Sequence, residues 1–367
     1  MTDRSSSPTS RRLAARHLGL CLDGRAKPEH LLADSGFLAL SEPDRRLCHE
    51  LLYGTLRNRL LLDAILTKLS RRPPRHLPGT VLNILRIAAY QILFLQRVPG
   101  YAAVNEAVNE IKRSPHAAIA PYVNGVLRNM ARLESPLALP GPESGPAEWS
   151  VRYSHPAFLV ERWLERHPPE AVRLWLDRSN RPQPHFLTIR TGRLPVSEFL
   201  EACATLGIPV QQPFPGLPVV ELAAAIPAAE ALIEAGLCFP QDLWSAAIAH
   251  LLPGEAYRNV ADVCAAPGGK SFGLADRFPG ARVFALDSQP DRVSTLKQRA
   301  AKLGLDNLFL AVGDALASPL PAAAFDLVLL DAPCSGTGTL GRNPDLRWKL
   351  DPEDSLRFGH RQAGLLQ

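Results

Sequence analysis

Residues 253–367 alternate apolar strand-like runs with helical segments, and this alternation restricts the fold more than any other feature. The runs "NVADVCAA", "ARVFALD", "LFLAVGD" and "FDLVLLDAP" predict strands, with helices expected from Gly269 and over 290–303. Alternation of this kind with apolar strands indicates a parallel sheet covered on both faces. Ligands of such sheets bind beyond the carboxyl ends of the strands. We therefore expect an α/β, Rossmann-like domain with its site at that edge.

Each predicted strand ends in residues suited to such a site. The first runs into "CAAPGGK", where Gly268 and Gly269 let the backbone approach a ligand and the next helix presents free N–H groups. The second ends at Asp287, whose carboxylate can accept both hydroxyls of a ribose. The third and fourth end at Asp314 and Asp331. An ordered series of four such ends predicts an adenosine-containing cofactor.

The turn sequence decides between two cofactors. A nicotinamide dinucleotide calls for G-x-G-x-x-G at the first turn, and A-P-G-G-K lacks that spacing. S-adenosylmethionine fits better, with its ribose at Asp287, its adenine near Asp314 and its methionine portion against the glycine turn. The residues expected to contact it are Cys264, Ala265, Ala266, Pro267, Gly268, Gly269, Lys270, Asp287, Asp314 and Asp331.

A thiol follows the fourth strand, in "LLDAPCSGTG". A carboxylate, a thiol and a methyl donor together point to methylation of a pyrimidine at C5, because that carbon is a poor nucleophile until a thiolate adds to C6. Asp331 would hold N3 and the exocyclic amine and supply a proton. We predict Cys334 and Asp331 as the catalytic residues. The alternative for Cys334 is a structural thiol at a strand end.

The front of the chain differs in pattern and in charge. Residues 1–133 carry 20 lysines and arginines against 10 acidic residues, whereas residues 134–367 carry 21 against 26. This asymmetry indicates a polyanion-binding front half. Apolar residues spaced by 3 and 4, such as Val81, Leu85 and Ala88, predict a helical bundle there. The predicted domains are 1–133 helical, 134–148 a proline- and glycine-rich linker, 149–252 a small α+β domain, and 253–367 the α/β domain.

Composition excludes several other classes. The six cysteines lack C-x-x-C pairing, so neither a zinc site nor a disulfide framework is indicated, and no metal is expected. Core positions are expected for Cys21, Cys48, Cys203 and Cys238. The N-terminal segment contains no apolar core of signal-peptide length and no later stretch could span a bilayer, which predicts a cytoplasmic protein without membrane contact. Arg178, Asn180, Arg181 and Arg190 are weak candidates for phosphate contacts.

The motifs "DVCAAPGGK", "ALDSQPDR", "GDA", "DLVLLDAPCSGTG" and "RNPDLRW", taken in order, resemble the RsmB (Fmu/Sun) family of 16S rRNA cytosine-5 methyltransferases. "YGTLRNRLLLDAIL", "LRIAAYQILFLQRVP" and "YVNGVLRNM" resemble that family's NusB-like RNA-binding domain. The resemblance implies a multidomain enzyme that acts on small-subunit ribosomal RNA with S-adenosylmethionine. We expect a monomer. It assigns Cys264–Lys270, Asp287, Asp314 and Asp331 to the cofactor.

The resemblance gives Cys334 a second possible role. In the family, the Pro-Cys thiol assists product release, and a second cysteine in a Thr-Cys-Ser turn attacks C6. That second cysteine is absent up to Gln367, inside a helix that Asp351 and Pro352 are expected to begin, so we expect a truncated, inactive fragment whose nucleophile lies beyond Gln367. Alternatively, Cys334 attacks C6 itself, as the Pro-Cys thiol does in DNA cytosine methyltransferases. A non-catalytic RNA-binding or assembly protein is the alternative function.

Overall fold

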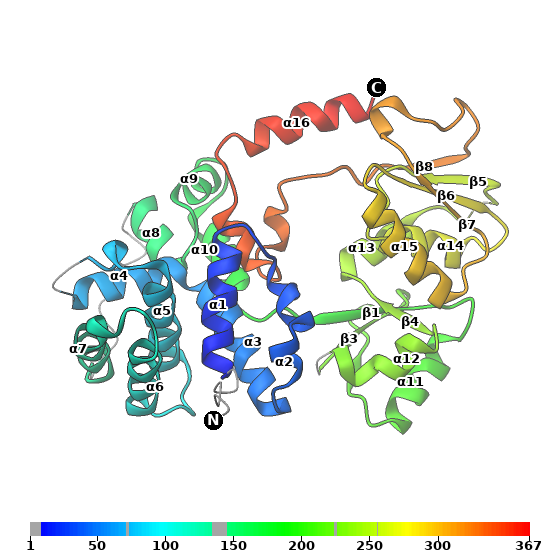
Figure 1. The fold of residues 1–367 in the computed structure, drawn as a ribbon. Helices are drawn as coiled ribbons and strands as arrows, with labels where there is room; N and C mark the ends of the chain where they lie inside the picture. The colour runs from blue at the N-terminus through cyan, green and yellow to red at the C-terminus, as the bar shows by residue number, and fades with distance from the viewer. Residues whose placement is uncertain (1–8, 71–72, 134–144, 224–225, 255) are drawn as a thin grey trace. The chain divides into compact units, whose positions relative to one another are not determined.

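The computed structural model describes residues 9–70, 73–133, 145–223, 226–254 and 256–367, and the chain forms two compact units (Figure 1). The helical unit comprises residues 1–183 and 336–354, and the sheet unit comprises residues 184–335 and 355–367. The chain therefore leaves the sheet unit after residue 335 and re-enters it at residue 355. The domain limits expected near residues 133, 148 and 252 stay a prediction, and most of the expected linker, 134–144, lies outside the described residues.

Helices packed in antiparallel fashion build the helical unit, which confirms the predicted bundle. Its α-helices are α1 (Ser10–Leu22), α2 (Ser35–Leu38), α3 (Glu42–Arg57), α4 (Arg59–Leu69), α5 (Gly79–Phe94), α6 (Gly100–Lys112), α7 (Ala120–Ala131), α8 (Pro146–Tyr153), α9 (Ala157–Arg166) and α10 (Pro169–Asn180). Its 3-10 turns are η1 (Pro28–Ala33), η2 (Pro74–His76), η3 (Ala117–Ile119), η6 (Thr337–Thr339) and η7 (Pro344–Trp348). Helix α1 packs on α3 and α5, and α6 packs on α5 and α7. Val81, Leu85 and Ala88 of α5 are buried in this core, as their spacing predicts.

A small antiparallel sheet of order β2-β3-β1-β4 opens the sheet unit. Its elements are β1 (His185–Ile189), α11 (Val196–Thr205), β2 (Val210–Gln211), β3 (Val219–Leu222), η4 (Ile226–Ala229), α12 (Glu230–Glu234) and β4 (Cys238–Pro240). Leu187, Phe199 and Cys203 lie in its core. Mixed helices and strands were expected in this region, but β2 and β4 are too short to leave a sequence signal.

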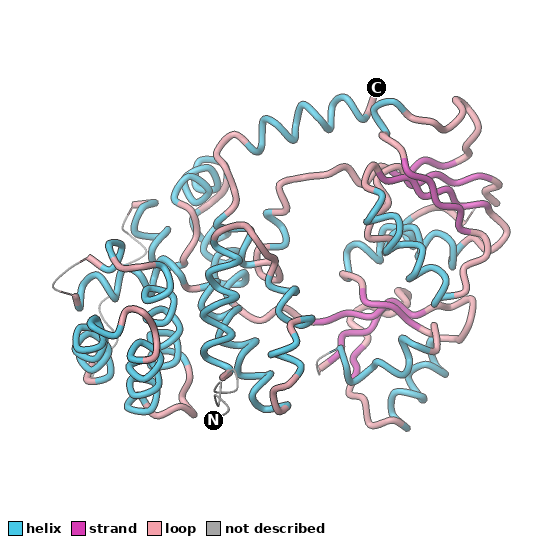
Figure 2. The backbone as a smooth tube through the Cα atoms, viewed as in Figure 1, coloured by secondary structure: helices cyan, strands magenta, loops and turns pink. Residues whose placement is uncertain are grey.

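The second sheet of this unit, drawn in magenta like the first in Figure 2, is entirely parallel and has the order β7-β6-β5-β8. Its strands are β5 (Asn259–Asp262), β6 (Arg282–Asp287), β7 (Leu308–Val312) and β8 (Leu327–Leu329). The accompanying helices are α13 (Leu243–Leu251), α14 (Gly269–Arg277), α15 (Pro290–Leu303), η5 (Ala315–Ala317) and α16 (Asp354–Leu365). This arrangement confirms the predicted Rossmann-like fold. The strand order reverses at β5, where such folds place their ligands.

One face of the parallel sheet is covered and the other is open in the described residues. Helices α14 and α15 pack on β6 and β7 (Figure 1). On the opposite face, Phe309 is 45% exposed and Val328 56% exposed. The expectation of two covered faces is therefore wrong for this part of the chain. Right-handed crossovers from β5 to β6 to β7 put both helices on one face, and the reversed crossover to β8 carries only the short η5.

Helix α16 begins later than the sequence predicts. Its first residue is Asp354, whereas Asp351 and Pro352 were expected to start it. The Asp351 carboxylate accepts a hydrogen bond from the Glu353 N–H at 2.8 Å, and the Asp354 carboxylate accepts one from the Asp351 N–H at 2.9 Å. These two bonds close a turn ahead of the helix, which delays its first residue.

Candidate active site

The four parallel strands end at one edge of the sheet, and acidic side chains stand at every end. β5 ends at Asp262 and β6 at Asp287, while Asp314 and Asp331 follow the last residues of β7 and β8 by two positions. The strand order puts the ends of β6 and β8 on either side of β5. Three acids predicted from separate motifs, Asp287, Asp314 and Asp331, thus share the carboxyl edge of one sheet with Asp262.

The turn between β5 and α14 is held by backbone bonds and by one glycine. Ala265 N–H donates to Leu286 O at 2.9 Å, which ties the turn to β6. Gly268 has a φ of +102°, and a Cβ there would lie 2.6 Å from Cζ of Phe272. Only glycine fits this position without a shift of the neighbouring ring. The close approach of bare backbone leaves the turn open to a ligand.

Asp287 organises the same turn from the neighbouring strand. Its carboxylate is 6% exposed by residue and accepts hydrogen bonds from Ala266 N–H and Gln289 N–H, each at 3.1 Å. Arg292 Nη1 lies 3.5 Å from Oδ2, and Arg292 Nη2 donates to Ala266 O. Since a carboxylate offers about four acceptor positions, Asp287 keeps capacity for ligand hydroxyls.

Asp262, which was not among the predicted site residues, is more deeply buried than Asp287. It is 1% exposed; its Oδ2 accepts from Ser271 Oγ at 2.6 Å, and its Oδ1 has no hydrogen-bond partner within the described part of the chain. Burial raises the pKa of Asp262 to about 6, while the Ser271 bond opposes the rise. A buried acceptor without a partner is rare in folded proteins. Its place at the end of β5 was the signal that could have identified it.

An ion pair joins the glycine turn to the end of β8. Lys270 Nζ lies 2.6 Å from Asp331 Oδ2, with the lysine side chain 15% exposed and the aspartate 54%. This contact confirms that the two motifs, which are 61 residues apart in the sequence, meet in space. It also engages one oxygen of the predicted catalytic carboxylate.

The two cysteines of this edge have different environments. Cys264 is half-buried; burial raises the pKa of its thiol, and the carboxylates of Asp262 and Asp287 raise it further. A thiol of this kind is a poor nucleophile, because the thiolate is the reactive form. Cys334 is exposed, and the Pro333 carbonyl before it accepts a hydrogen bond from Gln362 Nε2 at 3.0 Å. Cys334 is therefore the accessible thiol of the pair. The other four cysteines are buried, as predicted.

The remaining predicted residues divide into two groups. Asp314 is exposed and uses its carboxylate to cap η5 through Leu316 N–H at 3.1 Å. Arg190, a weak candidate for a phosphate contact, is 5% exposed and pairs with Asp276 at 3.0 Å, so that expectation is wrong. Asn180 is also used internally, since its side chain donates to Tyr153 O at 2.8 Å. Arg178 and Arg181 are exposed.

In the helical unit, the stretch "RNPDLRW" connects segments that are far apart in the sequence, through the buried side chain of Arg347. Arg347 is 1% exposed and donates to the carbonyls of Arg57, Ser154 and Ser179 and to the side-chain oxygen of Asn180, at distances from 2.7 to 3.2 Å. Burial lowers the pKa of Arg347 to about 9, and the Arg57 cation lowers it further. The side chain still stays cationic at neutral pH. Sequence patterns do not predict contacts between residues that are so far apart in the sequence.

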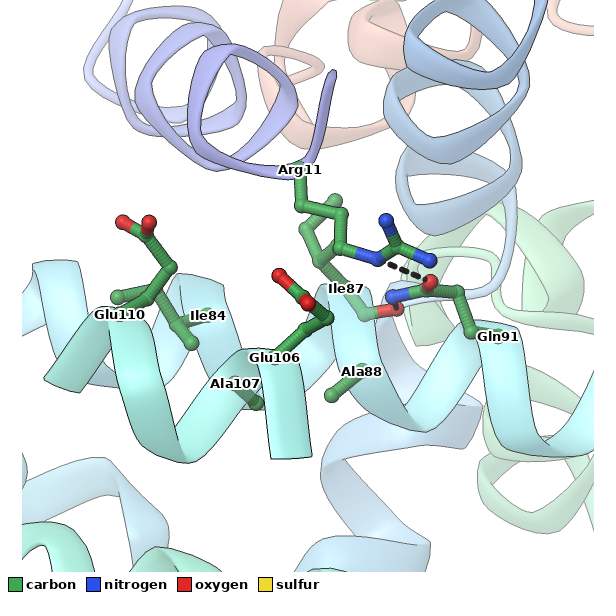
Figure 3. Close-up of a pocket in the computed structure, with 8 residues that line it drawn as sticks. All are labelled: Arg11, Ile84, Ile87, Ala88, Gln91, Glu106, Ala107 and Glu110. Carbon is green, nitrogen blue, oxygen red and sulfur yellow. Dashed lines mark hydrogen bonds between the residues drawn. The ribbon is translucent and has the colours of Figure 1, made fainter. Parts of the chain in front are cut away.

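Not every cation of the basic front half faces solvent. Arg86 is 6% exposed and makes two 2.7 Å contacts with Asp63. Figure 3 shows a crevice where Arg11 of α1 donates to Gln91 of α5 at 2.8 Å, beside Glu106 of α6. Its cavity volume of about 10 Å³ admits no more than about one water molecule. This crevice is a packing contact rather than a ligand site.

Among the described residues, no helix combines the length and the apolar content that a bilayer crossing requires. The same residues hold no group of three or more His, Cys, Asp or Glu side chains placed to bind a metal ion.

Comparison with known proteins defines the class of protein. Residues 9–132 match the NusB family, and residues 249–367 match the 16S rRNA methyltransferase RsmB/F family. The protein PH0851, of known structure, covers the same fold with a TM-score of 0.77 and 22% identity, over 100% of this chain and 83% of that one. NSun6 from Pyrococcus horikoshii, solved with SFG, matches with a TM-score of 0.50 and 17% identity over 57% of this chain and 78% of that one. The class is an RNA methyltransferase with a NusB-like helical domain.

Curated relatives narrow this class to one family. The probable ribosomal RNA small subunit methyltransferase B of Bacillus subtilis (strain 168) is 32% identical over 331 residues, which are 89% of this chain and 74% of the relative. Ribosomal RNA small subunit methyltransferase B of Salmonella paratyphi C (strain RKS4594) is 30% identical over 335 residues, 89% of this chain and 75% of the relative. The chain belongs to the family of ribosomal RNA small subunit methyltransferase B.

Proposed function

We propose that this protein transfers a methyl group from S-adenosylmethionine to C5 of a cytosine in small-subunit ribosomal RNA. The observation that carries the proposal is the Lys270–Asp331 contact at 2.6 Å, which joins the glycine turn to the strand end that leads into Cys334. A cofactor turn, a carboxylate and an accessible thiol thereby belong to one edge of the sheet. The family membership supports ribosomal RNA as the substrate.

The residues at this edge fit S-adenosylmethionine. The turn at Gly268 presents bare backbone, Asp287 keeps free acceptor positions for ribose hydroxyls, and Asp262 Oδ1 is a buried acceptor without a partner in the described residues. When bound, the cofactor supplies an activated methyl group. The relative NSun6 was solved with SFG, an analogue of this cofactor, which supports the assignment.

The side chains at the end of β8 supply the rest of the chemistry. Addition of a thiolate to C6 makes an S–C6 bond, moves the ring electrons toward N3 and turns C5 into an enamine carbon. Asp331 would hold the exocyclic amine and give N3 the proton that this addition requires. Once C5 carries its new methyl group, water takes the C5 proton, the S–C6 bond breaks with its electrons returning to sulfur, and N3 returns its proton to Asp331. Release of the thiolate ends the cycle.

Two assignments of Cys334 are compatible with this scheme. It attacks C6 itself, or it assists the release step while another thiol attacks. RNA containing 5-fluorocytosine separates them, because a ring that has fluorine at C5 has no proton to lose and stays bonded to the attacking sulfur. Peptide mapping of the trapped adduct identifies that sulfur as Cys334 or as another cysteine.

The proposal is tested by incubating the protein with S-adenosylmethionine and small-subunit ribosomal RNA and mapping 5-methylcytosine by bisulfite sequencing. Asp331→Asn should lower the rate at least about 100-fold, since a positioned acid contributes roughly that factor. Asp306→Asn is the control, because Asp306 is exposed on the same unit and outside the site. RNA that stays unmethylated at C5 with the unmodified protein, while the protein binds it, would favour the non-catalytic RNA-binding function.

A further inference from the structure

A cavity of about 320 Å³ lies in the helical unit, outside the candidate active site. Helices α9 and α10 form part of its wall, and Gln183, Thr337, Gly338, Leu340 and Gly341 complete it. Its size falls at the lower end of the range for small-ligand pockets. Trp163, Trp175, Arg178 and Gln183 are the side chains that give it chemical character.

Two tryptophans make the apolar part of the cavity. The ring centroids of Trp163 and Trp175 are 6.1 Å apart with planes at 83°, so the two indoles meet at a corner. Trp163 packs against the small core that includes Leu176, which fixes its position. Trp175 is 39% exposed, with His167 against it at a centroid distance of 4.8 Å. The corner therefore has one anchored wall and one wall open to solvent, as a stacking platform requires.

Polar groups complete the cavity. Gln183 Nε2 donates to the carbonyls of Arg178 at 2.7 Å and Arg181 at 3.0 Å, and these two bonds leave its Oε1 as an acceptor. The Arg178 side chain lines the cavity, is exposed, and has no ion pair or hydrogen bond with any described residue. The aromatic platform can stack on a nucleotide base, the fixed acceptor can bind the edge of that base, and the free guanidinium can bind its phosphate.

The backbone that closes the cavity follows the candidate catalytic thiol in the sequence. Thr337, a lining residue, comes three residues after Cys334, and three peptide links span at most about 11 Å. Gly341 seats this segment against Gln183, since a Cβ at Gly341 would lie 2.6 Å from Gln183 Nε2. A ligand in the cavity would therefore touch the segment that continues from the reactive strand end.

We propose that this cavity binds one unpaired nucleotide of the RNA substrate, with its base stacked on Trp175 and its phosphate held by Arg178. The inference rests on the proposed function only in taking RNA as the substrate. The bound nucleotide is held unpaired, which helps to keep its own stretch of the RNA single-stranded. A peptide would need acceptors and donors along an extended groove, whereas this cavity is short and offers one cation for one phosphate.

The test measures binding of a fluorescein-labelled single-stranded RNA to the full chain by anisotropy, with the same sequence as a duplex for comparison. Trp175→Ala should weaken single-strand binding on the order of tenfold, and Trp175→Phe should restore most of it. Arg178→Gln should weaken binding and reduce the salt slope by about 0.7, the value for one lost phosphate contact with a single strand. Leu174→Ala and Arg173→Gln are the controls, because both residues are exposed neighbours on α10 that do not line the cavity.

Crosslinking gives a second readout that does not depend on any substitution. RNA containing 4-thiouridine should crosslink to the peptide that carries Trp175. The proposal would be overturned if the Trp175 and Arg178 variants bound RNA as tightly as the unmodified protein, or if the control variants lost as much affinity. Either result would favour a protein side chain as the occupant of the cavity. This assay measures binding alone, so the two proposals can fail separately. The cavity variants can weaken RNA binding even if the protein does not methylate C5, and C5 methylation can be observed even if the cavity variants bind normally.

Discussion

Gly268 is the residue on which the geometry of the cofactor turn depends. Gly268→Ala should destabilise the sheet unit by about 2 kcal/mol and weaken S-adenosylmethionine binding, because the left-handed φ of +102° strains alanine and its Cβ would press on Phe272. Urea unfolding and calorimetric titration measure the two effects. Gly280→Ala is the matched control, since a Cβ at Gly280 meets nothing within 4 Å. Equal effects of the two substitutions would show that the turn tolerates a side chain.

In the helical unit, Arg347 is the residue whose hydrogen bonds hold distant segments together. Arg347→Met keeps most of the side-chain volume but leaves the carbonyls of Arg57, Ser154 and Ser179 without their donor, and we expect a loss of about 3 kcal/mol. Chemical denaturation followed by circular dichroism measures it. Arg173→Met, an exposed position on α10, should change stability by less than about 0.5 kcal/mol. A small loss at Arg347 would mean that water replaces the guanidinium.

At the scale of elements, local sequence signals were sufficient to predict an element where particular residues begin and end it. Helix α15 was predicted over 290–303 and occupies Pro290–Leu303, because Pro290 fits the first turn and Gly304, at φ +59°, ends the helix. The strands of the parallel sheet were predicted from apolar runs, which are also local in the sequence. The short β2 and β4, the order of the strands and the burial of Arg190 could not be predicted, since each depends on partners distant in the sequence.

The two faces of the parallel sheet lead to an element-scale prediction. Val260→Thr in β5 places a hydroxyl in a fully buried position and should cost about 2 kcal/mol, whereas Val328→Thr in β8 should cost less than about 0.5 kcal/mol because Val328 is 56% exposed. Thermal unfolding of both variants measures the difference. Equal costs would mean that the face carrying Val328 is covered in solution.

At the scale of the whole molecule, the path of the chain was the feature least accessible to sequence reasoning. The motif "RNPDLRW" lies within residues 249–367, which match the RsmB/F family, while residues 336–354 pack with the helical unit. Its bond from Arg347 to Arg57 O joins residues 290 positions apart, and Trp348 Nε1 donates to Leu56 O at 3.0 Å. Patterns of period 2 or 3.6 carry no information about such pairs. The active-site residues were predictable because parallel strands bring their own ends together.

The two units should respond to pH with opposite signs. In the helical unit, burial holds the pKa of His155 well below 6.5, the Arg347 cation lowers it further, and the bond to Tyr153 O opposes the shift. The unfolded chain then binds a proton that the folded unit does not, so stability is full above pH 6.5 and falls as the pH drops below it. In the sheet unit, the pKa of Asp262 is raised from 3.8 to about 6, so stability is full below pH 3.8 and is lost as the pH rises through 6.

These slopes can be separated by one substitution in each unit. Between pH 4.5 and 7, His155→Gln should remove the acid-side loss of the helical unit, and Asp262→Asn should remove a loss of about 2 kcal/mol from the sheet unit. Differential scanning calorimetry of the full chain across this range measures both, because the comparison is between slopes and tolerates a constant offset in each variant. Lys270 and Asp331 also face Asp262, so Asp331→Asn tests whether the second acid contributes. Parallel slopes in the unmodified protein and in both variants would refute the opposed dependence, since neither buried group would then change its proton uptake on folding.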